Sequence, residues 1–372
     1  MVAVMTPLTA HLIARIQKNG PLRISHFMEE ALGHPDFGYY MTRDPFGMGG
    51  DFTTSPEISQ VFGELIGAWC AAQWIAMDSP ASLHLVELGP GRGTLMADAL
   101  RATRAAPGFH DALNVHLIEN SPRLRTRQAK TLSKNWPTEQ VQWWRDPSQI
   151  PAGPVLFIAN EFFDALPIRQ FSRTDQGWSE RRIGLGNVAN GEPLAFEWGA
   201  PKADPPACIP TPLCDVAIGD LIEVSPVAQR IAYTISARLA VQGGAGLFID
   251  YGHKASGAGD TLQAVKDHAY CGVLETPGEA DLTAHVDFQS LGTAVTSGGA
   301  QVFPTVLQGE FLQRLGLNAR VEALVQRASP EQAADVLQAT HRLTAPAAMG
   351  SLFKVMAIAG PDDPIPPGFN VS

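Results

Sequence analysis

Short apolar runs alternate with helical segments between residues 83 and 161. The helical segments are 93–105 and 121–134, and the runs around them have the length of buried strands: LHLVELG (83–89), LNVHLIE (113–119), VQWWRD (141–146) and PVLFIANE (154–161). Such alternation indicates βαβ units and a parallel sheet. GAGLFIDYG (244–252) and SLFKVMAIA (351–359) predict two further strands, so the predicted fold class is α/β.

Other patterns flank and interrupt this alternation. Apolar residues at helical spacing predict helices over 8–18, 24–32, 56–77, 221–240, 286–297 and 309–342. IRQFSRT and WSERRIGLG predict an antiparallel hairpin around Asp175–Gly177, and AQVFPTV (300–306) predicts a short strand. Loops are expected over the aromatic-rich segment before Pro56, the Pro-rich segment 199–212 and the long segment 253–285.

These patterns divide the chain into a core and additions to it. The predicted parts are the N-terminal helices and aromatic loop (1–57), the first part of the core (58–166), a β-hairpin and Pro-rich insertion (167–214), the second part of the core with the loop 253–285 (215–306), a helical insertion (307–345), and the last core strand with the C-terminal tail (346–372). We expect the additions to form a smaller second domain, because 372 residues suffice for two domains.

Composition limits the classes of function. Hydrophobic residues make up 45% and charged residues 17%, which is ordinary for a folded protein, and the net charge of -10 argues against a general DNA or RNA binder. The four cysteines lack the close spacing of a zinc site, so we expect reduced thiols and no metal. Since no apolar run is long enough to cross a membrane and no targeting signal is evident, we expect a cytoplasmic protein without membrane insertion.

The strongest local signal is the loop that follows the first buried strand, Glu87-Leu88-Gly89-Pro90-Gly91-Arg92-Gly93. Glycines after a strand and before a helix let a ligand approach the main chain closely. The GK[ST] of a P-loop is missing, and the Glu87 carboxylate would repel a pyrophosphate. It suits the ammonium of S-adenosylmethionine instead, so we predict this cofactor. A tight turn without a ligand is the structural alternative.

Two acids follow the next strands. Glu119, with Asn120 beside it, ends the second strand, where a carboxylate can hold both ribose hydroxyls of an adenosine cofactor. This feature is shared with NAD enzymes, and a solvated strand end is a competing interpretation. Asp146 ends the third strand and is a candidate partner of the adenine amino group, or an ordinary polar strand end.

The fourth strand ends in Asn160-Glu161-Phe162-Phe163-Asp164. Ligands of open α/β sheets lie beyond the carboxyl ends of the strands, so Asn160, Glu161 and Asp164 are the candidate catalytic residues. Methyl transfer requires an aligned acceptor and removal of its proton, and a guanidinium would bind a pair of carboxylates. Helix capping and salt bridging are the structural alternative. Asp250, at the end of the fifth strand, is expected to point toward the same rim.

The quoted residues together resemble the class of S-adenosylmethionine-dependent methyltransferases that includes the mitochondrial complex I assembly-factor protein arginine methyltransferase and its bacterial relatives. The resemblance covers nearly the whole chain and rests on GPLRISHFMEEAL with HPDFGYY (20–40), GDFTTSPEISQVFGELIG (50–67), VELGPGRGTL (86–95), IANEFFDALPIRQF (158–171), LFIDYGH (247–253), ADLTAHVDF (280–288) and QGEFLQRLG (308–316). It implies a seven-stranded, mostly parallel Rossmann-like core.

The same resemblance implies symmetric dimethylation of arginine in a complex I subunit for the mitochondrial members, and it implies that Asp51 and Thr54 lie near the cofactor. Three other functions stay open: a small-molecule or RNA methyltransferase on the same core, a non-catalytic assembly chaperone that binds the cofactor, and, remotely, an NAD-dependent dehydrogenase. The methyl acceptor, the number of methyl groups and the oligomeric state are not encoded in any motif.

Overall fold

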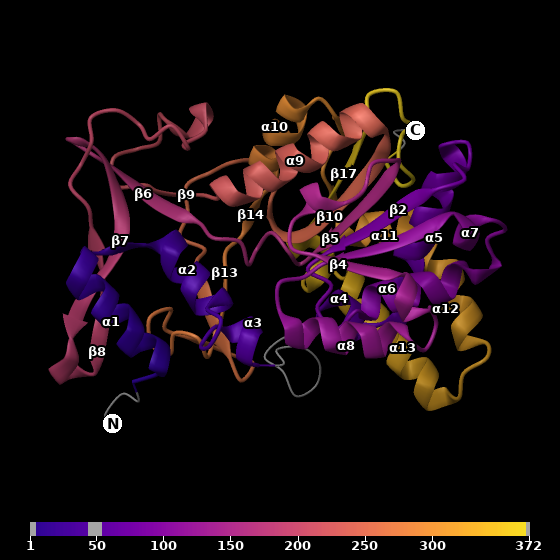
Figure 1. Ribbon diagram of the computed structural model, residues 1–372, viewed down its shortest axis with the longest axis horizontal. Coiled ribbons are helices and arrows are strands. Elements are labelled where there is room, and N and C mark those ends of the chain that lie inside the picture. The colour runs from indigo at the N-terminus through magenta and orange to yellow at the C-terminus, as the bar shows by residue number, and fades with distance from the viewer. Residues whose placement is uncertain (1–4, 44–53, 370–372) are drawn as a thin grey trace. The chain divides into compact units, whose positions relative to one another are not determined.

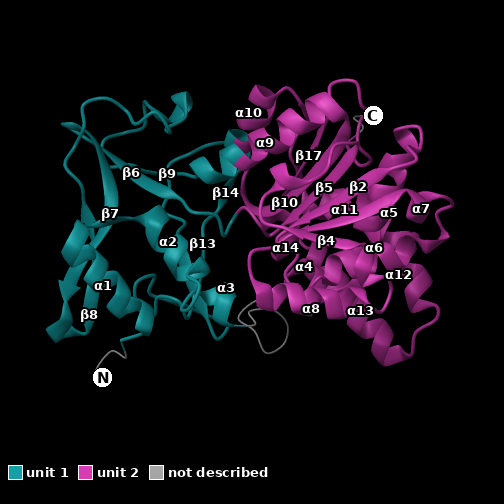
Figure 2. Cartoon of the chain, viewed as in Figure 1, with its two compact units in different colours: residues 1–52, 164–230, 255–290 teal, residues 53–163, 231–254, 291–372 magenta. Residues whose placement is uncertain are grey.

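The computed structural model describes residues 5–43 and 54–369, which fold into two compact units (Figures 1 and 2). The core unit comprises residues 53–163, 231–254 and 291–372, and the appended unit comprises residues 1–52, 164–230 and 255–290. Each unit has its own hydrophobic core. Among the described residues, no helix combines the length and apolar character required to span a bilayer.

The core unit is built on a mostly parallel sheet in the order β15-β17-β10-β5-β2-β3-β4. The strands are β2 (Leu83–Leu88), β3 (Leu113–Ile118), β4 (Val141–Trp144), β5 (Val155–Asn160), β10 (Gly244–His253), β15 (Gln301–Val302) and β17 (Phe353–Ala359), and the short β16 (Val306–Leu307) also pairs with β17. The strands from β10 to β4 are parallel, whereas β17 is antiparallel to β10. The predicted Rossmann-like α/β core is therefore confirmed.

The central strands are mostly apolar because both faces of the sheet are covered. Every residue of β2 and β5 is buried, as expected for the interior of a parallel sheet. The register pairs Leu88 with both Ile118 and Ala159. The carboxyl ends of β2, β3 and β5 consequently lie at one edge of the sheet, where Gly89 and Glu119 follow their strands and Asn160 ends β5.

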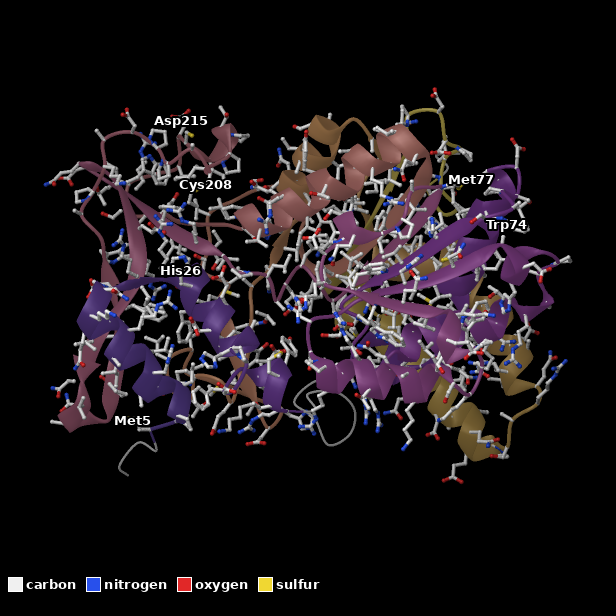
Figure 3. The ribbon with its side chains drawn as sticks, viewed as in Figure 1. Met5, His26, Trp74, Met77, Cys208 and Asp215 are labelled. Atoms are coloured by element: carbon white, nitrogen blue, oxygen red, sulfur yellow. The ribbon has the colours of Figure 1, made fainter. Side chains whose placement is uncertain are left out.

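Helices flank this sheet (Figure 1). They are α4 (Ser55–Ile58), α5 (Gln60–Ala76), α6 (Thr94–Ala102), α7 (Phe109–Ala112), α8 (Pro122–Leu132), α11 (Gln308–Arg314), α12 (Leu317–Val325), α13 (Pro330–Thr344) and α14 (Met349–Leu352). α5 crosses α6 closely, because a Cβ at Gly67 would lie 2.7 Å from Ala99. At its far end Trp74, labelled in Figure 3, contacts Phe109 with the ring centroids 5.4 Å apart, and its indole N–H donates to the Pro80 carbonyl.

A chain of hydrogen bonds crosses three strands of the core sheet. The Trp144 indole N–H donates to His116 Nδ1 at 3.0 Å, and His116 Nε2 lies 2.8 Å from His84 Nδ1. Because an indole only donates, His116 must carry its proton on Nε2 and His84 must donate from Nε2 to the Ala152 carbonyl. Burial lowers the pKa of His116 to about 4 and also lowers the pKa of His84, so both rings are neutral.

The appended unit contains two small sheets and three N-terminal helices. The larger sheet has the order β1-β7-β6-β9, with β8 beside β7, and the smaller has the order β12-β11-β13. The elements are α1 (Pro7–Asn19), β1 (Leu22–Arg23), α2 (Ile24–Gly33), α3 (Tyr39–Thr42), β6 (Arg169–Thr174), β7 (Gly177–Asn187), β8 (Glu192–Trp198), β9 (Leu221–Val224), β11 (Gln263–Lys266), β12 (Ala269–Cys271) and β13 (Asp281–Thr283). The predicted hairpin is β6–β7.

Several local predictions need correction. The helix expected over 221–240 begins as strand β9, which pairs with β6, and becomes α9 only at Pro226–Gln242. The loop expected over 253–285 contains the β12-β11-β13 sheet, and α10 (Phe288–Gly298) follows it. The strand expected over 300–306 is split into β15 and β16, and the helix expected over 56–77 is split at Ser59. The cysteines are free thiols, as predicted.

Candidate active site

The loop Gly89–Gly93 joins β2 to α6 and requires glycine for its backbone. The φ angles of Gly89, Gly91 and Gly93 are 61°, 52° and 80°, a region that other residues rarely adopt. A Cβ at Gly89 would lie 2.8 Å from the ring of Phe162, while Pro90 is buried beneath the loop. The glycine loop therefore packs directly against the turn that follows β5, the fourth strand of the predicted alternation.

Glu87 lies inside the core unit, one residue before the end of β2, and is 3% exposed. Its carboxyl accepts from the Met96 main-chain N–H in the first turn of α6, but Oε2 has no hydrogen-bond partner within the described part of the chain. Burial raises the pKa of Glu87 to about 8. A buried acceptor without a partner is costly, so this oxygen is placed to receive a donor from a ligand.

Glu119 directly follows β3 and is tied to the glycine loop through α8. Its Oε1 accepts from the Ser121 N–H at 2.8 Å, and its Oε2 accepts from Gln128 Nε2 at 3.0 Å. The same Gln128 amide donates to the Gly91 carbonyl at 2.8 Å. Burial raises the pKa of Glu119 despite these bonds. Sequence reasoning missed Gln128, because nothing distinguishes it within the polar helix α8.

The two other predicted adenosine contacts are exposed. Asn120 lies on the surface beside Glu119. Asp146 caps the short helical turn Pro147–Gln149, where its Oδ1 accepts from the Ser148 N–H at 2.9 Å. This capping is the ordinary role that the sequence left open for Asp146. A contact of Asp146 with adenine, and of Asn120 with the cofactor, stays a prediction.

The turn after β5 brings Asn160 and Glu161 together with Ser55 of α4. Glu161 Oε1 accepts from the Ser55 main-chain N–H at 2.8 Å and from Asn160 Nδ2 at 3.2 Å. With its amide nitrogen used in this way, Asn160 presents Oδ1, which is buried without a hydrogen-bond partner among the described residues. The Ser55 hydroxyl is likewise buried and unsatisfied within that part of the chain.

α4 also contacts the glycine loop. Glu57 accepts a hydrogen bond from the Thr94 hydroxyl at 2.5 Å, and Arg92 lies 3.7 Å from the other carboxylate oxygen of Glu57. Thr54 is the N-cap residue of α4 and makes no side-chain capping bond, whereas Asp51 lies outside the described residues. The sequence predicted one continuous helix from residue 56, so neither its break after α4 nor these contacts were foreseen.

These atoms fit the cofactor that the sequence predicts. Once ionised, the Glu87 carboxylate can only accept hydrogen bonds, and the Ser55 hydroxyl can accept one. The ammonium and ribose hydroxyls of S-adenosylmethionine are donors. Glu87, the glycine loop and Glu119 are the residues that would hold it, at an edge of the sheet where such ligands bind.

Asp164, the third predicted catalytic residue, belongs to the appended unit. It is 6% exposed, and its carbonyl accepts from the Ala284 N–H at 2.9 Å. Asp281 is also buried and accepts from the Tyr40 hydroxyl at 2.8 Å. Burial and the charges of Asp281 and Asp164 raise the pKa of Tyr40 well above 10. Participation of Asp164 in catalysis stays a prediction.

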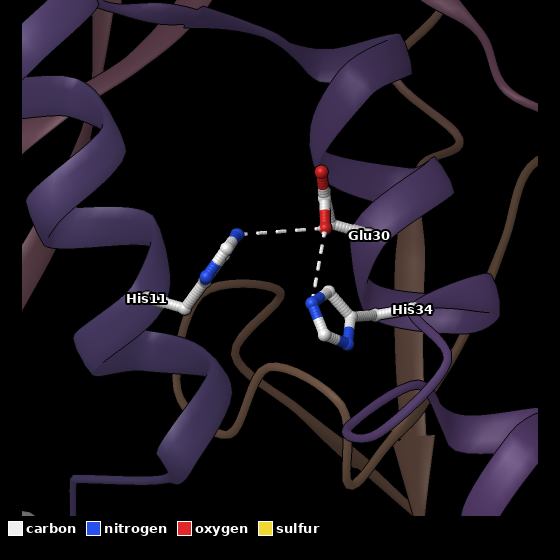
Figure 4. Close-up of side chains that lie close together, drawn as sticks. All are labelled: His11, Glu30 and His34. Carbon is white, nitrogen blue, oxygen red and sulfur yellow. Dashed lines mark ion pairs between the residues drawn. The ribbon is translucent and has the colours of Figure 1, made fainter.

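One group in the appended unit has the residue types of a metal site. His11, Glu30 and His34 present ligand atoms within 4.8 Å of one another (Figure 4). However, Arg15 already pairs with Glu30, and His34 Nδ1 accepts from the Asp36 N–H at 3.1 Å. That bond fixes the proton of a neutral His34 on Nε2, the atom that would have to bind the metal. The arrangement therefore favours the ion pair of Glu30 with Arg15 over metal binding.

Comparison with known proteins gives consistent matches. The family model described as "Putative S-adenosyl-L-methionine-dependent methyltransferase" matches residues 65–306. Protein arginine methyltransferase NDUFAF7, mitochondrial, of Homo sapiens is 37% identical over 95% of this chain and 83% of its own length, and that of Danio rerio is 36% identical over 94% and 86%. A Burkholderia thailandensis protein solved with bound S-adenosyl-homocysteine is 28% identical, with a TM-score of 0.83 over 100% of this chain and 97% of that one.

Proposed function

This chain belongs to the family of S-adenosyl-L-methionine-dependent methyltransferases, and on that premise we propose that it methylates arginine side chains of a protein substrate. It is an enzyme whose cofactor is S-adenosylmethionine. The relatives that share 36–37% identity are named protein arginine methyltransferases, and this chain covers more than four fifths of their length.

The observation that carries the proposal is the set of acceptor atoms after β5. A guanidinium carries five N–H donors and no acceptor, so it requires acceptors on the protein. Asn160 Oδ1 is a buried acceptor without a partner among the described residues, and Glu161 supplies a carboxylate next to it. A hydroxyl acceptor would need only one of these groups, whereas a guanidinium can use both.

These residues can perform the steps that methyl transfer requires from a protein. The bound cofactor supplies an electrophilic methyl group. Asn160 and Glu161 would orient the acceptor nitrogen, which supplies the rate advantage of alignment. The Glu161 carboxylate would then take the proton that the methylated nitrogen must lose. Its hydrogen bonds from Ser55 and Asn160 fix one oxygen in place for this role.

The proposal includes three finer predictions, the first two from the family resemblance and the third from the sequence pattern alone. The acceptor is a subunit of respiratory complex I, the product is symmetric dimethylarginine, and the protein acts in the cytoplasm. The names of the relatives support an arginine in a protein as the methyl acceptor, and they name no particular substrate protein. Complex I subunits from cells lacking this gene are therefore the first substrates to test.

The decisive experiment is transfer of a radiolabelled methyl group from S-adenosylmethionine to protein extract from such cells. We expect label in protein that acid hydrolysis returns as methylarginine. A Gly91→Val variant should transfer none and serves as the control. Label found only on lysine, RNA or small molecules would contradict arginine as the acceptor, while leaving methyl transfer itself intact.

A further inference from the structure

Asp250 is a fully buried acid near the carboxyl end of β10 that the transfer chemistry above does not use. It is 0% exposed and lies on the strand next to β5. Its Oδ2 accepts from the main-chain N–H groups of Phe162 and Phe163 at 3.1 and 3.0 Å. Its Oδ1 accepts from its own neighbour Tyr251 at 3.0 Å.

The turn that Asp250 holds contains a strained residue. Glu161 has a φ of 50°, in the left-handed region that costs a residue with a side chain on the order of 1 kcal/mol or more. Its own N–H remains bonded to the Ile249 carbonyl at 2.9 Å, so the chain leaves the sheet abruptly after Asn160. The next two N–H groups would be unsatisfied without the Asp250 carboxylate.

The strain has a consequence for the direction of the side chains. With Glu161 left-handed, its carboxylate reaches the Ser55 N–H and the Asn160 amide, and the Phe162 ring packs against Gly89. A relaxed Glu161 would rotate the turn and separate these groups. Backbone strain is retained only where surrounding contacts enforce it, and the two amide bonds to Asp250 are such contacts.

We propose that Asp250 is a positioning residue for methyl transfer: its carboxylate anchors the Glu161–Phe163 turn and so aims Asn160 and Glu161 at the reacting groups. This inference rests on the proposed role of the post-β5 residues. It assigns no proton transfer and no ligand contact to Asp250. A displacement of about 1 Å of positioning groups can cost about a hundredfold in rate.

The test compares two Asp250 variants with a matched control. Asp250→Asn keeps the shape but presents an amide N–H to the turn, and Asp250→Glu keeps the carboxylate but shifts it by one methylene. The control is Asp363→Asn, because Asp363 also accepts a main-chain N–H of β10, that of Gly244 at 2.7 Å, at the opposite end of the strand. Each protein is assayed for kcat, acceptor KM, calorimetric Kd for S-adenosylmethionine, and Tm.

We expect both Asp250 variants to lower kcat about a hundredfold, with KM and the cofactor Kd within about threefold of wild type. The control Asp363→Asn should have the kcat of wild type, and the largest effect expected of it is a lower Tm. The inference is overturned if Asp250→Asn retains kcat, if cofactor affinity falls in proportion to kcat, or if neither Asp250 variant folds, since Asp250 would then act in stability alone. Failure of the wild type to label arginine would instead overturn the proposed function.

Discussion

Binding of S-adenosylmethionine should release a proton from Glu87. The apo carboxyl has its pKa raised to about 8 by burial, so it is protonated at neutral pH. An ammonium placed against Oε2 favours the ionised form and lowers this pKa. Binding therefore couples to loss of the proton, and the affinity should rise with pH as long as the apo carboxyl is protonated.

The size of the pH effect on cofactor affinity follows from the pKa of Glu87 in the free protein and in the complex. If the ammonium restores the ordinary carboxyl pKa of about 4.5, linkage predicts roughly a 70-fold decrease in Kd between pH 5.5 and pH 7.5. At pH 7, close to one proton (about 0.9) should leave the complex. The pH range for comparing Kd ends at 7.5 because the α-amino group of S-adenosylmethionine loses its own proton near pH 8.

Isothermal titration calorimetry in two buffers of different ionisation enthalpy measures both the Kd and the protons released. Glu87→Gln removes the titrating group at constant size, so its Kd should be weaker at pH 7.5 and nearly flat with pH. Asp98→Asn is the matched control, because burial also raises the pKa of Asp98 in α6, but Asp98 pairs with Arg101. A flat Kd without proton release in wild type, or an unchanged slope in Glu87→Gln, would refute the reasoning.

Three further outcomes are expected. Gly91→Val forces a β-branched residue to a φ of 52° and should weaken cofactor binding at least about a hundredfold by calorimetry, whereas Gly257→Val, with open space at its Cβ, should not. Ser55→Ala removes a buried hydroxyl without a partner in the described chain, so it should raise Kd or KM about tenfold without lowering Tm; a lower Tm with unchanged binding would show a packing role. Since the pKa of His116 is lowered from 6.5 to about 4, the unfolded state binds more protons between these values, and roughly 3 kcal/mol of stability present above pH 6.5 should be lost toward pH 4. The difference in urea unfolding between wild type and His116→Gln isolates this contribution, and parallel pH profiles of the two proteins would contradict it.

The parts of the fold that the sequence predicted are those determined by local pattern. Strands β2 and β5 are largely apolar because they are buried on both faces, and the glycine loop between β2 and α6 is marked by its own residues. The strand β9 was missed because a four-residue apolar run is ambiguous, and its pairing with β6 decides its structure. The β12-β11-β13 sheet was missed for the same reason, since strands of three or four residues carry little periodicity.

The candidate site shows the same division between local and long-range information. Glu87 and Glu119 could be selected because one lies at, and the other just after, the end of a strand that is visible in the sequence. Gln128, which joins the Glu119 carboxylate to the Gly91 carbonyl, could not, because its role depends on how α8 packs on the loop. Asp250 was expected at the rim, but its two bonds to the turn after β5 depend on the neighbouring strand register.

α4 explains why the cofactor loop and the transfer turn should act as one structure. One end of this four-residue helix donates the Ser55 N–H to Glu161, and its Glu57 accepts from Thr94 and lies near Arg92. A ligand that orders the glycine loop therefore also restrains Glu57, and through α4 it restrains the hydrogen bond that fixes Glu161. This coupling runs through Ser55 and Glu57 of α4, and it is separate from the bonds that Asp250 makes to the turn after β5.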